Sequence, residues 1–109
     1  MSEKRKGDRV PLDIYLNKFV AGVPYLAKAW DISAEGVSLA HLIEPQNPVR
    51  RVGLQFQLPG SDEVIYAEGE VVRQWGDARR PKSGVRFTRL TERHRQMIHA
   101  FVHDQLVTH

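Results

Sequence analysis

The sequence predicts an all-β fold, a six-stranded antiparallel β-barrel followed by one C-terminal α-helix. Apolar and polar residues alternate in several short segments, which is typical of strands with one buried face. Segments rich in Gly, Pro, Asn and Asp separate them and predict turns. The spacing of apolar residues becomes helical only near the C-terminus. A closed barrel is favoured because closure removes the sheet edges that invite aggregation.

In the first half of the chain, the alternation predicts three strands. Ala21-Gly22 is a turn signal between the first two, and Gly36 ends a polar segment that separates the second strand from the third. The two prolines in segment 44–48 predict a loop before the fourth strand. The three expected strands cover residues 10–16, 25–30 and 37–39.

The second half predicts three further strands and the helix. Residues 59–62, Pro-Gly-Ser-Asp, are a turn signal that joins the fourth and fifth strands in a hairpin. Residues 76–83 are expected to form a basic loop before a short last strand. Thr91 is the expected N-cap of an amphipathic helix over 92–106, whose apolar stripe would cover one opening or side of the sheet. The expected strands cover 52–58, 64–75 and 85–87.

The composition fits one cytoplasmic domain. A chain of 109 residues suits a single domain with a flexible arm at 1–9, a barrel at 10–88 and the capped helix at 91–106. Cysteine is absent, which excludes disulfides and thiolate metal sites. No apolar run approaches the roughly 18 residues that a membrane helix needs, and no apolar stretch follows the N-terminal charges as in a signal peptide. We therefore expect no membrane insertion.

Positive charge is unevenly distributed along the chain. The formal net charge is +3, yet residues 73–95 contain eight basic and two acidic residues, a local net charge of +6. Eleven of the sixteen basic residues are arginine, whose planar guanidinium can bind a phosphate through two hydrogen bonds. This bias indicates an anionic partner, although a solvated basic surface would have the same composition.

Two short motifs lie on either side of the first predicted strand hairpin. Arg5 and Arg9 form an R-x-x-x-R pair before the first strand, and Asp31, Ser33 and Gly36 form D-x-S-x-x-G between the second and third strands. Taken alone, the first motif is compatible with a solvated terminus. The second is compatible with an ordinary polar turn, in which Asp and Ser bond to nearby backbone.

Together and in this order, the two motifs resemble the PilZ domain family of bacterial cyclic di-GMP receptors. The segment 84–87, Gly-Val-Arg-Phe, also resembles the last strand of that family, ahead of a C-terminal helix. The resemblance covers about residues 4–106. It implies that Arg5 and Arg9 hold phosphate and guanine, and that Asp31, Ser33 and Gly36 build the facing wall of the site.

The chemistry of these residue types suits that ligand. Arginine can pair with phosphate, with guanine O6 and N7, or stack on a base. Aspartate can accept from guanine N–H groups, and a glycine lets a ligand approach the backbone closely. Lys4 and Lys6 could add electrostatic attraction. The resemblance also makes Arg73 and Trp75, near the end of the fifth strand, weaker candidates for contact with the ligand, and the sequence leaves both roles open.

No arrangement of side chains argues for catalysis or for a metal. His99 and His103 lie four residues apart on the predicted helix, but no third ligand is evident, and both are expected to be exposed histidines. No Ser/His/Asp or paired-carboxylate arrangement stands out. We expect no enzyme activity and no cofactor.

The favoured interpretation is a cyclic di-GMP sensor that acts on an unidentified effector protein. Residues 1–9 are too charged to fold alone, so ligand bound at 31–36 would recruit Arg5 and Arg9 and order the arm. One alternative is a relative that does not bind the ligand and serves as a protein adaptor in motility or pilus assembly. Another is a small nucleic-acid-binding barrel that uses the basic stretch, although nucleic acid is the less favoured partner.

Overall fold

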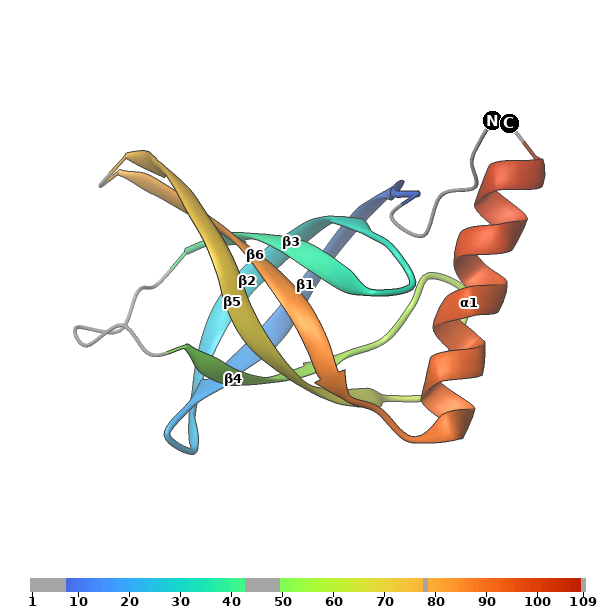
Figure 1. The fold of residues 1–109 in the computed structure, drawn as a ribbon, viewed down its shortest axis with the longest axis horizontal. Coiled ribbons are helices and arrows are strands. Elements are labelled where there is room, and N and C mark those ends of the chain that lie inside the picture. Colours follow the sequence, from blue (N-terminus) through green and yellow to red (C-terminus); the bar gives the residue numbers. More distant parts are fainter. Residues whose placement is uncertain (1–7, 43–49, 78, 109) are drawn as a thin grey trace.

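Six antiparallel strands close into a barrel in the computed structural model, which describes residues 8–42, 50–77 and 79–108. The order around the barrel is β1-β2-β3-β6-β5-β4, and β1 pairs with β4 to close it (Figure 1). The predicted six-stranded barrel with one C-terminal helix is therefore confirmed. The elements are β1 (Val10–Val20), β2 (Val23–Ile32), β3 (Gly36–His41), β4 (Arg51–Phe56), β5 (Ile65–Asp77), β6 (Arg80–Arg89) and α1 (Glu92–Val107).

The β1–β2 hairpin turns at the two residues that the sequence indicated. Ala21 and Gly22 have φ angles of 51° and 82°, and Val20 pairs directly with Val23. Two consecutive residues with positive φ match the twist of the flanking strands in a two-residue loop. The expected loop at 44–48 lies outside the described residues.

The barrel interior is filled by the alternate apolar side chains of the strands. Small buried residues such as Ala27, Ala29 and Ala67 lie among larger ones, so that the side chains can interdigitate. Every strand contributes at least one of the buried side chains. They are Val10, Leu12, Leu16, Val20, Ala27, Ala29, Ile32, Val37, Leu39, Val52, Leu54, Phe56, Ile65, Ala67 and Val85, with Leu58 from the following loop.

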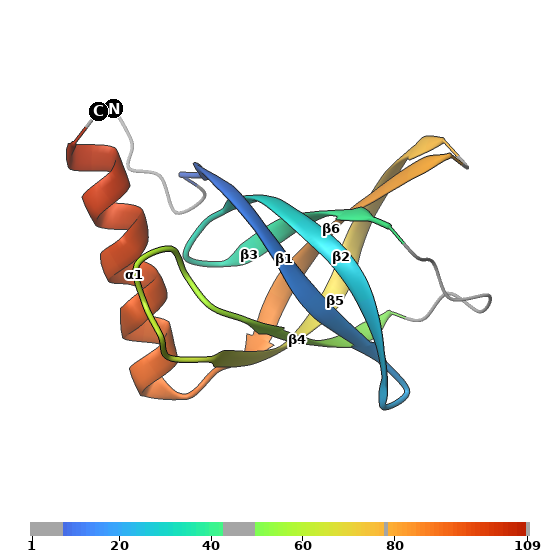
Figure 2. The same cartoon turned by 180° about the vertical axis from the view of Figure 1, so that it is seen from behind.

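Helix α1 lies across one end of the barrel (Figures 1 and 2). Ile98 and Val102 are buried in the same core as the strand side chains, with Met97 and Phe101 packed beside them. The helix begins as predicted, because the Thr91 side chain accepts from the backbone N–H of His94 and satisfies one of the free donors of the first turn. The helix therefore caps the barrel opening.

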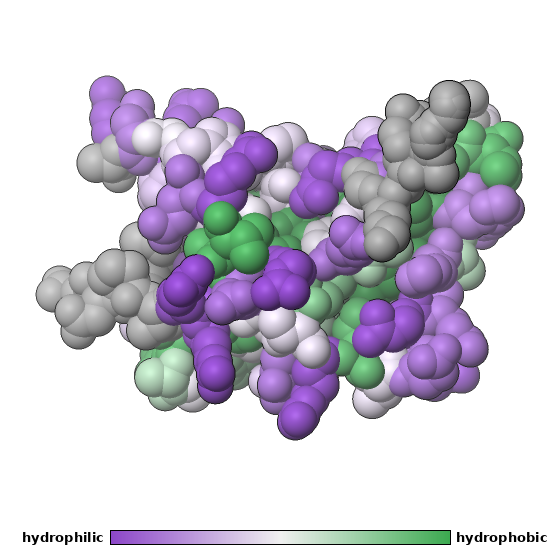
Figure 3. All heavy atoms as spheres, viewed as in Figure 1, coloured by the Kyte–Doolittle hydropathy of each residue, from purple (hydrophilic) through white to green (hydrophobic). Residues whose placement is uncertain are grey.

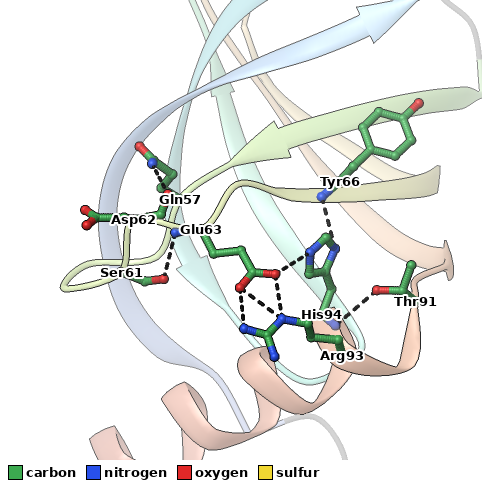
Figure 4. Close-up of polar contacts among 8 residues, drawn as sticks. All are labelled: Gln57, Ser61, Asp62, Glu63, Tyr66, Thr91, Arg93 and His94. Atoms are coloured by element: carbon green, nitrogen blue, oxygen red, sulfur yellow. Dashed lines mark hydrogen bonds and ion pairs between the residues drawn. The ribbon is translucent and has the colours of Figure 1, made fainter.

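A polar cluster fixes the start of α1 to the loop between β4 and β5 (Figure 4). The Glu63 carboxylate accepts from the Arg93 guanidinium at 2.6–3.0 Å and lies 3.2 Å from Nε2 of His94. Nδ1 of His94 accepts from the backbone N–H of Tyr66 at 3.4 Å. The hydrogen bonds and charge of Arg93 lower the pKa of Glu63 below its usual value. These bonds anchor the helix at its first turn.

The prediction of a basic loop at residues 76–83, followed by a short last strand, is wrong. Instead, β5 continues to Asp77 and β6 begins at Arg80, so that the two strands form a long hairpin. Asp77 closes the turn, since its carboxylate accepts from the backbone N–H groups of Arg79 and Arg80, both at 2.9 Å. The outer part of this hairpin has no buried face, so its residues show none of the alternation by which a strand is recognised in a sequence.

Candidate functional site

The guanidinium of Arg9 joins the two sequence motifs. Its Nε donates to Oδ1 of Asp31 at 2.8 Å, and its terminal nitrogens lie 3.0 Å from Oγ of Ser38 and 3.4 Å from Oγ of Ser33. Arg9 precedes β1, whereas Asp31 is the second-last residue of β2 and Ser38 lies on β3. The charge-assisted bond to Asp31 is the strongest kind available to this side chain, and it brings the two motifs together.

Ser33 shapes the turn between β2 and β3. Its hydroxyl oxygen accepts from the backbone N–H groups of Glu35 and Gly36 at 3.1 and 3.2 Å, and its own backbone N–H donates to the Gly36 carbonyl at 2.8 Å. The side chain is fully buried. Serine is suited to this position because a short hydroxyl can replace a backbone acceptor in a tight turn. The contribution of Ser33 to the site is therefore the conformation of the turn.

Gly36 lacks a side chain because β6 leaves no space for one. A Cβ on Gly36 would lie 2.3 Å from the carbonyl oxygen of Val85. The φ of Gly36 is not positive, so the requirement concerns space and not backbone conformation. The neighbouring Glu35 carbonyl accepts from the Phe87 N–H at 2.8 Å. Gly36 thus presses the motif against β6, which differs from the direct approach to a ligand that the sequence suggested.

Two irregularities in strand pairing direct side chains into the site. Between Ala29 and Asp31, the β2–β3 register shifts, and as a result both Trp30 and Asp31 line the same outer cavity. Between Val71 and Arg73, the β5–β6 register shifts as well. A β-bulge of this kind redirects the residues that follow it, because one extra residue reverses the alternation of faces.

The second bulge explains the position of Arg73 and Trp75. Val71 pairs with the inward-facing Val85, and strict alternation would carry Arg73 and Trp75 to the inside as well. After the bulge, Arg73 pairs with Gly84, and both Arg73 and Trp75 line the outer cavity. Gly84 adds no side chain to the cavity between Arg73 and Trp75. A Cβ there would lie 3.7–3.8 Å from both side chains and would occupy part of this space.

The cavity has a volume of about 340 Å³ and is open to solvent. The Trp30 and Trp75 rings meet edge to face, with centroids 6.2 Å apart and planes at 76°. The Arg73 guanidinium lies 4.3 Å from the Trp75 ring centroid, close enough for a cation–π interaction. On another wall, Arg86 donates to Glu70 at 2.7 Å. The lining comprises Arg9, Trp30, Asp31, Ser33, Glu35, Gly36, Ser38, Val72, Arg73, Trp75, Gly84, Val85 and Arg86.

The structure brings together the predicted site residues that it describes. Arg9, Asp31, Ser33 and Gly36 all line the cavity, and so do the weaker candidates Arg73 and Trp75. Arg5, Lys4 and Lys6 lie outside the described residues. Trp30, Ser38 and Arg86 also line the cavity, although they were not among the residues predicted from the sequence. Trp30 could have been suspected from its place directly before Asp31, whereas the other two depend on strand pairing.

The arrangement suits an anionic ligand with aromatic rings. Three guanidinium groups face one cavity and can bind phosphate or the acceptor edge of a base. The two indoles supply flat surfaces for stacking. The carboxylate of Asp31 is half-buried and can accept from ring N–H groups while it orients Arg9. Cationic, aromatic and acceptor groups for such a ligand thus lie around one cavity.

The described residues contain neither a cluster of metal-ligating side chains nor a membrane-spanning helix. Within 8–42, 50–77 and 79–108, no three His, Asp or Glu side chains gather as a metal site would require, and His99 and His103 are exposed. The described part of the chain contains no helix with the length and apolar character needed to cross a bilayer.

The fold is shared with several solved structures. The chain superposes on the Bacillus subtilis inhibitor of motility (MotI/DgrA) with a TM-score of 0.82 at 14% identity, covering 98% of this chain and 53% of that one. It superposes on the PilZ domain of Escherichia coli YcgR, solved with c-di-GMP, with a TM-score of 0.68 at 11% identity, covering 97% of this chain and 94% of that domain.

A third match is the Borreliella burgdorferi PlzA protein in complex with c-di-GMP. The TM-score is 0.62 at 6% identity, and the match covers 94% of this chain and 53% of that one. The chain therefore spans about half the length of MotI/DgrA and of PlzA. None of the curated protein sequences compared with the chain matches it significantly. The sequence profile of the PilZ domain matches residues 3–104, nearly the whole chain, and the chain accordingly belongs to the PilZ domain family.

Proposed function

We propose that the cavity beside Arg9 binds cyclic di-GMP and that the domain acts as a receptor without catalysis. The observation that carries this proposal is the Arg9 guanidinium, held by Asp31 and Ser38 at the mouth of a cavity with two indole walls. Cyclic di-GMP presents two phosphates and two guanines, so it needs both kinds of contact in one place. The structures of YcgR and PlzA, which were solved with this ligand, support the proposal.

Each residue of the site has a distinct role in this proposal. Arg9 pairs with a phosphate or with guanine O6 and N7, while Asp31 fixes its orientation and accepts from a guanine N–H. Ser33 and Gly36 set the turn that positions Asp31. Trp30 and Trp75 offer stacking surfaces, which favours a dinucleotide over inorganic phosphate.

We further propose that ligand orders the part of the N-terminal arm that precedes Arg9, since the Arg9 side chain is already held by Asp31 and Ser38. Residues 1–8 include five charged residues and few apolar ones, a composition that disfavours folding on its own. Arg5, four residues before Arg9, would close over the ligand, with Lys4 and Lys6 adding attraction. The ordered arm would then present a new surface to an effector protein.

Calorimetric titration with cyclic di-GMP, with GTP as the control ligand, tests the binding site. The wild-type protein should bind the dinucleotide and not GTP, and Arg9→Ala should weaken binding at least tenfold through the loss of a charge-assisted contact. Arg95→Ala is the matched control, since Arg95 is equally cationic but exposed on α1 at one end of the barrel. A wild-type protein that does not bind would favour the adaptor alternative.

Amide hydrogen exchange tests the arm separately. Amides of residues 2–8 should exchange more slowly when cyclic di-GMP is present, whereas those of α1 should not change. Unchanged exchange of the arm under saturating ligand would rule out the ordering step and leave the binding site itself intact.

A further inference from the structure

The β5–β6 hairpin extends beyond the closed barrel. β4 pairs with β5 only as far as Glu70, and β3 pairs with β6 only from Lys82 onward, so the segment from Val72 to Pro81 is paired within the hairpin alone among the described residues. In Figures 1 and 2, this end of the hairpin projects from the side of the molecule opposite α1. The projection is thus a surface separate from the barrel wall.

The projecting hairpin is basic and its charges are uncompensated. Residues 72–83 contain four basic side chains, at Arg73, Arg79, Arg80 and Lys82, and one acidic side chain, at Asp77. Hydrophilic side chains cover this end in Figure 3. Within the described chain, none of the four cations forms an ion pair, whereas the cations Arg9, Lys28, Arg86 and Arg93 are each paired with a carboxylate.

Aromatic rings alternate with these cations at the base of the hairpin. The Arg73 guanidinium lies over Trp75, Trp75 meets Trp30, and the ammonium of Lys82 lies 5.7 Å from the centroid of the Trp30 ring. Trp30 is 39% exposed, a high value for the largest apolar side chain. The result is a row from Arg73 through Trp75 and Trp30 to Lys82. Nearer the tip, Arg80 pairs with Asp77 and Arg79 lies in the turn. We call the row together with Arg79 and Arg80, but without Asp77, the hairpin surface.

We infer that the hairpin surface binds single-stranded nucleic acid. Proteins that bind single strands combine cations that follow the phosphate backbone with aromatic rings on which bases stack. The hairpin surface contains both, with Trp30 of β2 beside the residues of the β5–β6 hairpin. An acidic protein segment would use the cations but gain little from the two indoles, and the bases of a duplex are stacked inside it, out of reach of a flat ring. Single strands therefore match the surface best.

Fluorescence anisotropy with a labelled oligothymidylate of about 10 nucleotides tests the inference in the absence of cyclic di-GMP. The affinity should fall with salt, and Arg79→Ala combined with Arg80→Ala should weaken binding at least tenfold and reduce the salt slope by about 1. Trp75→Ala should weaken binding about tenfold through lost stacking. Arg95→Ala, which removes one charge from α1, should leave the affinity within about twofold.

Two competitors separate the possible partners. A polyglutamate peptide of matched charge and a duplex of the same sequence should each displace the oligonucleotide at least tenfold less well than the unlabelled single strand. Equal competition by polyglutamate would overturn the inference in favour of an acidic protein partner. Equal effects of Arg95→Ala and of the Arg79/Arg80 double variant would also overturn it. The double variant should bind cyclic di-GMP normally, so the failure of one proposal is distinguishable from that of the other.

Discussion

Nε of Arg9 donates to Oδ1 of Asp31 at 2.8 Å across 22 positions of sequence. This bond connects the R-x-x-x-R motif to the D-x-S-x-x-G motif. Asp31 therefore has two tasks in the proposed site, since it orients a guanidinium and also offers a free lone pair to a ring N–H. The carboxylate lowers the local positive charge, which disfavours anions that make no specific contacts.

Asp31→Asn should weaken cyclic di-GMP binding about tenfold, or ~1.4 kcal/mol. Asparagine keeps the shape and one acceptor oxygen but removes the charge that fixes Arg9. Calorimetry with the ligand measures the change. Glu35→Gln is the matched control, because Glu35 lines the same cavity but has no hydrogen bond to Arg9 among the described residues. Equal losses in the two variants would contradict a specific role for Asp31.

Gly36→Ala should destabilise the domain by about 1–3 kcal/mol, because the new methyl group would overlap the Val85 carbonyl on β6. Neither backbone can yield without disturbing the β3–β6 pairing that places the turn. Urea denaturation measures the effect. Gly84→Ala is the control on the neighbouring strand, where an added Cβ would meet its nearest neighbours at ordinary contact distances of 3.7–3.8 Å. Equal stability of the two variants would refute this reason for the glycine.

The barrel could be predicted from sequence because most of its strands have one buried face. The regions that were predicted wrongly lack this alternation of buried and exposed residues. Residues 76–77 and 80–81 pair only within the hairpin and include no buried side chain, so no alternation marks them as strand. At the other extreme, Lys18 lies at an inward position of β1, 4% exposed, where its ammonium is 2.9 Å from Nδ1 of His41. A buried lysine cannot be distinguished from an exposed one by residue type.

The site could be predicted where its residues are close in sequence and could not where bulges place them. Asp31, Ser33 and Gly36 form one turn, and their spacing is itself the signal. Trp30 and Trp75 meet only because two strands each contain one extra residue at a shifted register. A single residue reverses the face of everything after it, and no local pattern reveals where that happens.

Tryptophan fluorescence should report directly on ligand binding. The chain has two tryptophans, and both line the cavity with their ring centroids 6.2 Å apart. A guanine that stacks on either indole should change the emission, and Trp75→Phe should remove most of that change while leaving the fold intact, because phenylalanine retains an aromatic ring. Titration with cyclic di-GMP followed by emission spectra measures this. A calorimetric binding signal with no change in emission would place the ligand away from the indoles.

The contact between Glu63 and Arg93 should make the stability of the domain depend on pH in acid. Arg93 holds the pKa of Glu63 below its usual value of 4.5, so the native state favours the ionised carboxylate. A lowered native pKa contributes stability above the unfolded-state pKa, and that contribution is lost as the pH falls through the native pKa. The free energy of unfolding should therefore decline below about pH 5, with protonation of Glu63 releasing Arg93 from the loop.

Glu63→Gln should lower the stability at neutral pH and make its decline in acid shallower, because the titrating group is gone. Denaturation midpoints at about pH 7 and about pH 3.5 measure both effects. Glu68→Gln is the control, since Glu68 is exposed on β5 and forms no ion pair in the part of the chain that the structure describes. His94 also faces Glu63, with its Nε2 3.2 Å from the carboxylate. Parallel pH profiles for the wild type and Glu63→Gln would mean that Arg93 contributes nothing to anchoring α1 on the barrel.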